Sequence, residues 1–168
     1  MVRFPTMKRH AVPRLPRVLA AMDTLIANQQ VRDIERDRDL DYDYDHIREA
    51  VKYAKTLALK RRMDPDLAAT AAALQNIGRI VTGRTEGHAE AGYLPTKEFL
   101  AHLSCFTDKE IEEVATAVRH HSRKGLKDAP LDELAKDVDI YARYLQGHAF
   151  TRTEDIARLQ KMRLELEF

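Results

Sequence analysis

The sequence predicts an all-α fold, and three observations support this. Apolar residues recur at spacings of three and four through most of the chain, helix-capping signals precede several of these stretches, and no segment alternates apolar and polar residues as a β-strand would. A length of 168 residues suits one domain with a single core. We therefore expect one helical domain of about six to eight helices.

Composition narrows the classes of function. The net charge is +1 with 33% charged residues, which indicates a well-solvated surface and favours neither nucleic-acid polymers nor membranes as partners. A single cysteine, Cys105, excludes an internal disulfide framework, and no apolar run is long enough to cross a bilayer. We expect a cytoplasmic protein.

The first third of the chain divides into an arm, a charged run and, between them, a helical stripe of apolar residues formed by Val18, Leu19, Met22, Leu25 and Ile26. Residues 1–13 are expected to be an irregular arm because prolines interrupt any helix there, and residues 14–168 to form the helical domain. Residues 32–45 are interpreted as a solvated connection whose last aspartate caps the next helix, with a cation-binding acidic loop as the alternative. That next helix is expected over about residues 46–61.

An alanine-rich helix over residues 68–79 is the predicted centre of the fold. Asp64-Pro65-Asp66 opens it with a capping oxygen and a proline suited to the first turn. Gly78 is expected to end it, which places Gln75 and Asn76 in its last turn. Because these two carboxamides neighbour apolar positions, they are expected to lie near buried surface and to need polar partners.

The segment that follows is expected to be a loop leading into an interrupted helix. Residues 81–87 contain two glycines and no apolar periodicity, which predicts a loop, and loops of this kind often border a functional site. The helix beginning at His88 must kink or restart around Pro95, because proline cannot donate a hydrogen bond to the preceding turn.

Three further helices complete the predicted domain. A capping box at residues 107–110 begins the first, whose apolar face reaches His121 while His120 is rotated away. The second covers residues 131–145, and the third residues 151–168. The apolar stripe of this last helix is expected to pack either on the same domain or on a second copy of the chain, as in a homodimer.

The run Leu-Gln-Asn-Ile-Gly-Arg at residues 74–79 resembles the Leu-His-Asp-Ile-Gly-Lys type run that gives the HD superfamily of metal-dependent phosphohydrolases its name. Four other segments resemble family segments in the same order, over residues 44–147: Tyr44–Arg48 with His46, Gly87–Gly92 with His88, Val118–Ser122 with His121, and Asp137–Asp139. The resemblance implies an HD-domain-like helical fold. It also shows both residues of the His-Asp pair replaced.

The resemblance implies a site for a divalent transition metal such as Mn, Fe, Ni or Zn. The implied ligands are His46, His88, His121 and Asp139, with Asn76, Gln75 and His120 as weaker candidates. Two dications about 4 Å apart repel by roughly 17 kcal/mol at an effective dielectric of about 20, so they need a bridging anion, which the neutral Asn76 cannot supply. A two-metal centre is therefore not expected without an external anion, and binding of a single metal is expected to be weak or absent.

The histidines also have purely structural interpretations. Alone, His46 is typical of a capping or surface histidine, and His121 of a core histidine bonded to backbone. Asp139 borders the inner face of its helix and needs a cation or several N–H donors, whether or not a metal is present.

Basic residues predict where an anion would bind. Arg79 stands where the family often has lysine, and we expect Arg79, Arg84 and Arg119 to bind phosphate, because guanidinium groups match phosphate in a bidentate way. Arg123 and Lys124 also lie near the helix ends that would rim the cavity, but they are interpreted as ordinary solvated charges rather than as phosphate ligands. Catalytic roles, if catalysis survives, would fall to Arg79 and Asp139.

Two functions follow from this pattern. The first is a degenerate HD domain that binds a small phosphorylated molecule or nucleotide as a regulatory module, with metal-dependent hydrolysis weakened or lost. The second is an active phosphohydrolase that acts on a nucleotide or phosphomonoester with an altered ligand set, with water as the nucleophile. The fold-level resemblance favours the second, and the replaced His-Asp pair favours the first.

Overall fold

The computed structural model describes residues 13–167 and confirms the all-α prediction. The helices are α1 Leu15–Ala27, η1 Asp33–Glu35 (a 3₁₀ turn), α2 Leu40–Lys60, α3 Pro65–Leu74, α4 Ile77–Thr82, α5 His88–Ala91, α6 Tyr93–Leu103, α7 Asp108–His120, α8 Pro130–Leu145 and α9 Thr153–Glu167. Within the described range no strand occurs, and seven α-helices have ten or more residues, in agreement with the expected number. The predicted arm at residues 1–13 lies almost entirely outside this range.

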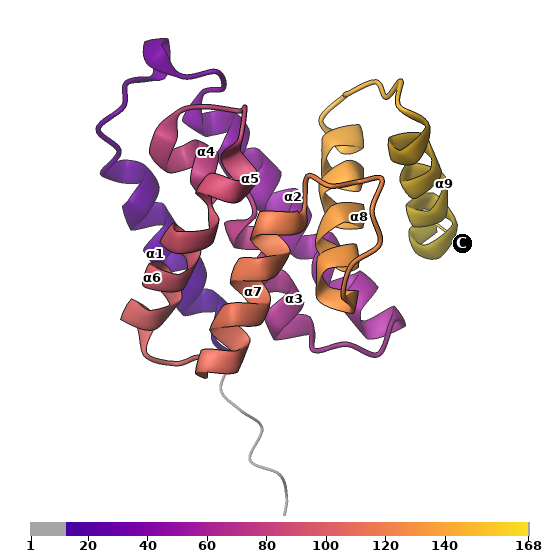
Figure 1. Ribbon diagram of the computed structural model, residues 1–168, viewed down its shortest axis with the longest axis horizontal. Helices are drawn as coiled ribbons and strands as arrows, with labels where there is room; N and C mark the ends of the chain where they lie inside the picture. Colours follow the sequence, from indigo (N-terminus) through magenta and orange to yellow (C-terminus); the bar gives the residue numbers. More distant parts are fainter. Residues whose placement is uncertain (1–12, 168) are drawn as a thin grey trace, which may run out of the picture.

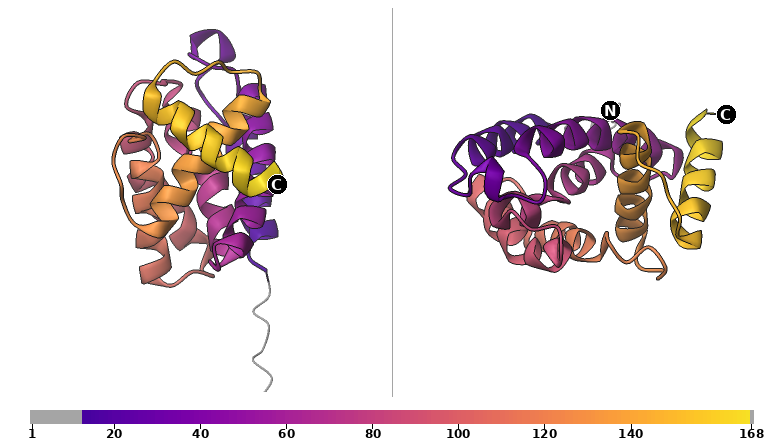
Figure 2. Two further views of the ribbon diagram at one scale, coloured as in Figure 1. Left: turned by 90° about the vertical axis from the view of Figure 1, so that its right-hand side faces the viewer. Right: turned by 90° about the horizontal axis from the view of Figure 1, so that it is seen from above.

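Helix α3 is the centre of the bundle and packs against α1, α2, α7 and α8 (Figure 1). Every residue from Ala68 to Leu74 is buried. This accounts for the alanine content, because a helix surrounded by others needs small side chains to let their axes approach. Helix α9 lies outside α8, as the views from the side and from above show (Figure 2), and it packs on α8 and α2 of the same chain.

Helix α2 begins earlier than the sequence predicted. Asp39 caps it by accepting a hydrogen bond from the Tyr42 backbone N–H at 2.8 Å, so the expectation that the last aspartate of the charged run caps a helix starting near residue 46 is wrong. The extra turns place Asp43 on the buried side of the helix, fully shielded from solvent. Part of the charged run is therefore inside the protein.

The helix predicted over residues 68–79 is two helices. It breaks at Gln75 and Asn76, between α3 and α4, and Gly78 lies inside α4 rather than at a helix end. A Cβ atom at Gly78 would lie 2.0 Å from the backbone oxygen of His88. Glycine is required there because the backbone of α5 packs directly on α4, and the break lets the chain turn so that this contact forms.

Other local predictions stand with small shifts. The capping box is confirmed, since the Thr107 hydroxyl accepts from the Glu110 N–H while the Glu110 carboxylate accepts from the Thr107 N–H. The predicted loop begins at Gly83, with a φ of 74°, because α4 continues to Thr82. The helix restarts at Tyr93, so that the following proline falls in its first turn. Between residues 13 and 167 no helix is both long and apolar enough to cross a membrane.

A buried ion network joins α9 to the rest. Asp137 is fully buried and accepts hydrogen bonds from Arg61 at 2.6 Å and Arg158 at 2.8 Å. Burial alone would raise the pKa of the neighbouring Glu133, but hydrogen bonds from Lys136, a backbone N–H and Arg158 lower it to about 2. The last helix is therefore fixed by charge as well as by its apolar side.

Candidate functional site

A pocket of about 280 Å³ opens among α2, α4, α5, α8 and the segments that follow α7 and α8. It contains six of the predicted site residues: His46, Asn76, Arg79, His88, His121 and Asp139. Segments far apart in the sequence thus meet in one cavity. Gln75 lies directly behind it, fully buried against His46.

Hydrogen bonds occupy both ring nitrogens of His46. Its Nδ1 lies 2.8 Å from the side-chain oxygen of Gln146, to which it donates. Its Nε2 lies 2.7 Å from the amide nitrogen of Gln75 and 3.3 Å from Asp139 Oδ1. Both ring nitrogens of His46 therefore have partners within the protein, and one of these partners is the glutamine that stands where the family run has a histidine.

Lys124 occupies the position beside the central carboxylate. Its ammonium donates to Asp139 Oδ2 at 2.6 Å and to the backbone oxygen of His121, and Lys124 is only 5% exposed. Burial alone would raise the pKa of Asp139, but the Lys124 charge and the His46 ring outweigh it and hold that pKa well below its usual range. The expectation that Lys124 is an ordinary solvated charge is wrong.

His88 and His121 face each other across the pocket. Their Nε2 atoms are 3.1 Å apart, and each Nδ1 donates to a backbone oxygen at 2.7 Å, His88 to Thr85 and His121 to Val118. Burial lowers the pKa of His121 to about 3, so its ring is neutral at pH 7. Two Nε2 lone pairs then point toward each other, an arrangement suited to a shared proton or cation.

Arg79 is in the pocket, but its charge is already matched. It is 7% exposed and donates through Nε to Asp43 Oδ1 at 3.1 Å, forming a buried ion pair between α4 and α2. The other two predicted phosphate ligands are outside the pocket. Arg84 is exposed near Asp37, at 3.6 Å, and Arg119 pairs with Glu90 at 3.0 Å.

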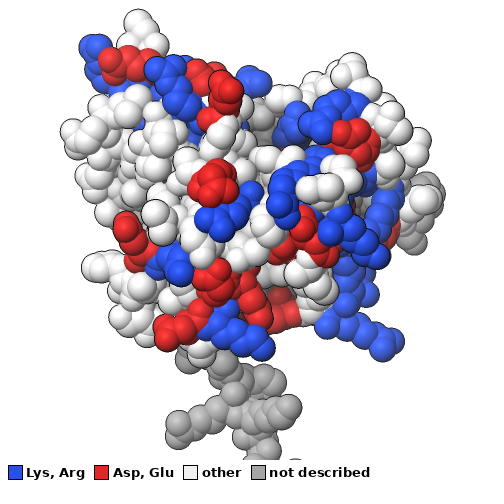
Figure 3. Space-filling view, viewed as in Figure 1, with Lys and Arg blue, Asp and Glu red and all other residues white. Residues whose placement is uncertain are grey.

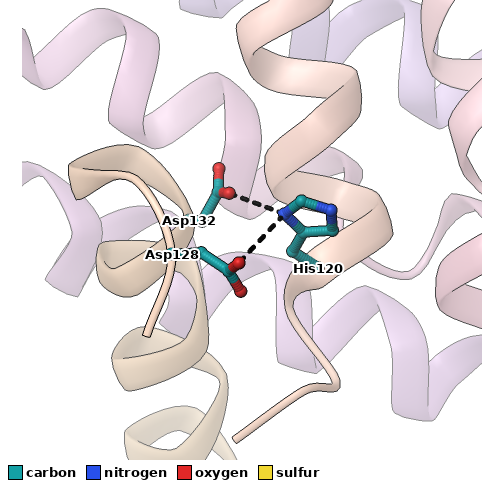
Figure 4. Close-up of side chains that lie close together, drawn as sticks. All are labelled: His120, Asp128 and Asp132. Atoms are coloured by element: carbon teal, nitrogen blue, oxygen red, sulfur yellow. Dashed lines mark hydrogen bonds and ion pairs between the residues drawn. The ribbon is translucent and has the colours of Figure 1, made fainter. Parts of the chain in front are cut away.

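His120 belongs to a separate cluster with Asp128 and Asp132 (Figure 4). Among the described residues, this is the one group of three possible metal ligands whose ligand atoms all lie within 4.8 Å of one another. His120 Nδ1 is 2.7 Å from Asp132, and Asp128 already binds Arg123 and Lys136, each at 2.6 Å. The cluster is an ion-pair network whose negative charge is matched by cations.

Several polar atoms at the pocket have no partner. Among residues 13–167, the amide oxygen of Gln75, the amide nitrogen of Asn76 and one carboxylate oxygen of Asp155 are buried without a hydrogen bond. Buried polar groups are normally paired, so unpaired ones around a cavity indicate a place where a polar ligand completes the bonding.

Sequence reasoning missed much of the pocket lining. It did not predict Arg38, Tyr42, Thr85, Ser122, Arg143, His148, Arg152 or Asp155, and it set Lys124 aside as a solvated charge. One signal was available: Arg143 lies four residues after Asp139, a spacing that brings helical side chains together, and the two are 3.9 Å apart. The surface charge agrees with the many basic residues in this lining, since Lys and Arg predominate on the side of the molecule formed by α8 and α9 (Figure 3).

The pocket residues do not fit the metal centre that HD domains typically hold. Asp139 is bonded to an ammonium and His46 to an amide, and no three of the four implied ligands come within 4.8 Å of one another as a set. The donor chemistry disagrees as well, because Gln75 and Asn76 are neutral where the family run supplies an imidazole and a carboxylate. Only His88 and His121 retain free ring nitrogens directed at a common point.

The fold and this pocket define a helical protein in which distant histidines and an aspartate converge on one cavity. Comparison with protein families matches residues 43–144 to the HD domain, and since this is more than half of the chain, the protein belongs to the HD domain family. No significant match is found among curated proteins.

A solved structure supports the fold. The crystal structure of a predicted HD superfamily hydrolase from an uncultured Thermotogales bacterium superimposes with a TM-score of 0.60, at 20% sequence identity, over 95% of this chain and 91% of that chain. At this identity the similarity concerns the fold.

Proposed function

We propose that this protein is a degenerate HD domain whose pocket binds a small phosphorylated molecule or nucleotide as a binding or regulatory module, with metal-dependent hydrolysis weakened or lost. One observation carries the proposal: the atoms that would hold the metal are bonded to one another and to Lys124. His46 is paired with Gln75, and Asp139 with Lys124. A pocket arranged in this way is complete without a divalent ion.

The charges of the pocket favour an anionic ligand. Its lining contains the cations Arg38, Arg79, Lys124, Arg143 and Arg152 but only the carboxylates Asp139 and Asp155. Arg79 and Arg152 are matched by Asp43 and Glu154 outside the lining. The remaining balance is still positive, because three cations stand against two carboxylates. Because guanidinium and ammonium groups bind phosphate strongly in shielded sites, a phosphate ester suits this cavity better than a neutral or cationic molecule.

A second candidate function, hydrolysis with one metal ion, is favoured by the facing Nε2 atoms of His88 and His121. When bound, a metal of the family kind would make a water molecule acidic enough to attack a phosphate. This candidate requires that two imidazoles, helped by few other ligands, retain the ion.

Metal analysis and a phosphatase panel distinguish the two functions. The proposed function predicts less than stoichiometric metal in freshly purified protein, no turnover of phosphomonoesters with Mn, Fe, Ni, Zn or Mg, and measurable binding of nucleoside monophosphates in EDTA. Near-stoichiometric metal, with turnover that Asp139→Ala abolishes, would establish the hydrolase instead.

A further inference from the structure

Lys124 has one donor left over. A lysine ammonium carries three N–H groups, and within the described part of the chain two are used, by Asp139 and by the backbone oxygen of His121. Lys124 also lines the pocket, whereas the neighbouring Lys127 is exposed on the surface of the same segment. The third N–H is therefore available to an oxygen that enters the cavity.

The position of Lys124 is held from outside the pocket. Arg158 of α9 donates to the Lys124 backbone oxygen at 2.9 Å, and the Lys124 ammonium in turn holds the end of α7 through the His121 oxygen. A side chain fixed at both its backbone and its charged end is preorganised, so little conformational entropy remains to be lost when a ligand binds.

We propose that Lys124 is the resident cation of this pocket: its ammonium stands in for the metal's charge beside Asp139 and donates its free N–H to the anionic group of the ligand. This inference rests on the proposed function and adds the residue that recognises the anion without a metal. The recognised chemistry is a phosphoryl oxygen, since the ammonium binds it as a point charge.

The test is calorimetric titration with inorganic phosphate and nucleoside 5′-monophosphates in EDTA. The double variant Lys124→Met/Asp139→Asn removes both members of the ion pair, so it keeps the net charge of the pocket and leaves no buried charge unpaired. Against Asp139→Asn alone, we expect the double variant to bind about 10- to 100-fold more weakly, the range expected for one hydrogen bond to a charged group. Lys127→Met is the matched control and should bind as the unaltered protein does.

The single variant Asp139→Asn provides an independent measurement, in which the affinity for phosphate is expected to rise rather than fall. Because it frees the ammonium and removes a negative charge, we expect phosphate to bind more tightly than to the unaltered protein. Thermal unfolding followed by circular dichroism checks that each variant is folded, and Asp139→Asn alone decides the question if the double variant is not.

The outcomes separate this inference from the proposed function. Suppose that the unaltered protein binds phosphate compounds in EDTA, but that removal of Lys124 changes the affinity by less than twofold or that Asp139→Asn weakens binding. Lys124 is then not the donor to the anion, whereas the proposed function as a binding module still holds. Binding that appears only when metal is added overturns the resident-cation role. If no probe binds with or without metal, the proposed function itself fails, and the inference with it.

Discussion

Restoring the family's His-Asp pair should not by itself restore a metal site. The variant Gln75→His/Asn76→Asp supplies the missing imidazole and carboxylate, but the Lys124 ammonium remains 2.6 Å from Asp139 Oδ2. We expect this variant to bind Mn²⁺ weakly, and the variant that also carries Lys124→Met to bind it about 100-fold more tightly.

The magnitude follows from the geometry. A metal bound to that oxygen at about 2.1 Å cannot be more than about 5 Å from the ammonium, and at an effective dielectric of about 20 a dication and a unit charge at this distance repel by about 7 kcal/mol. This corresponds to about five orders of magnitude in affinity for as long as the lysine stays where it is. Movement of the lysine toward water relieves much of it, which is why about 100-fold is expected.

Calorimetry with MnCl₂ and NiCl₂, together with elemental analysis of the purified variants, measures the difference. The control adds Lys127→Met in place of Lys124→Met, which makes the same change of net charge on an exposed side chain. If the two-residue variant already binds Mn²⁺ as tightly as the one lacking Lys124, the ammonium does not compete with metal, and our account of the pocket is wrong.

Three further predictions concern stability. Gly78→Ala should cost about 3 kcal/mol or more in urea unfolding, because its Cβ would overlap backbone atoms of α5, whereas Gly125→Ala, with its nearest neighbour at 3.9 Å, should be within about 0.5 kcal/mol of the unaltered protein. Asp43→Asn should cost about 3 to 5 kcal/mol because it leaves a buried guanidinium unpaired, and equal loss in the exposed-pair control Glu113→Gln would contradict this reasoning. Since the pKa of Glu133 is lowered to about 2, its contribution to stability is complete above the unfolded pKa of about 4.3 and is lost as pH falls toward 2. Glu133→Gln should therefore flatten the dependence of the unfolding free energy on pH over that range. An unchanged slope would refute this prediction.

The sequence predicted the fold, and which residues meet in the pocket, where a regular pattern of residues marks them. Helical periodicity and the capping box identified most of the bundle, and the order of the family segments identified residues that the structure brings into one pocket, such as His46 and Asp139. It failed at the break between α3 and α4. Local propensity favours a continuous helix there, and only the approach of α5 to Gly78 shows why the chain turns.

Lys124 shows the same limit at the site. It lies after the end of a helix beside an exposed arginine, where lysine is usually solvated. The fifteen-residue separation from Asp139 does not predict whether the two side chains face each other. The near-buried aspartate did indicate that a cation or donor must be close. Which one it was depends on how the connecting segment folds back, and that is fixed by contacts with α9 that no local pattern reveals.

The match to the HD domain ends at residue 144, whereas Arg158 lies beyond it and bonds to the backbone oxygens of Lys124 and Leu126. A shortened chain trimmed to the recognisable region would keep His46, His88 and His121 but lose Arg158, which fixes the backbone of Lys124. Such a fragment would give a misleading picture of ligand preference, so cloning boundaries and affinity tags are best kept clear of the final helix.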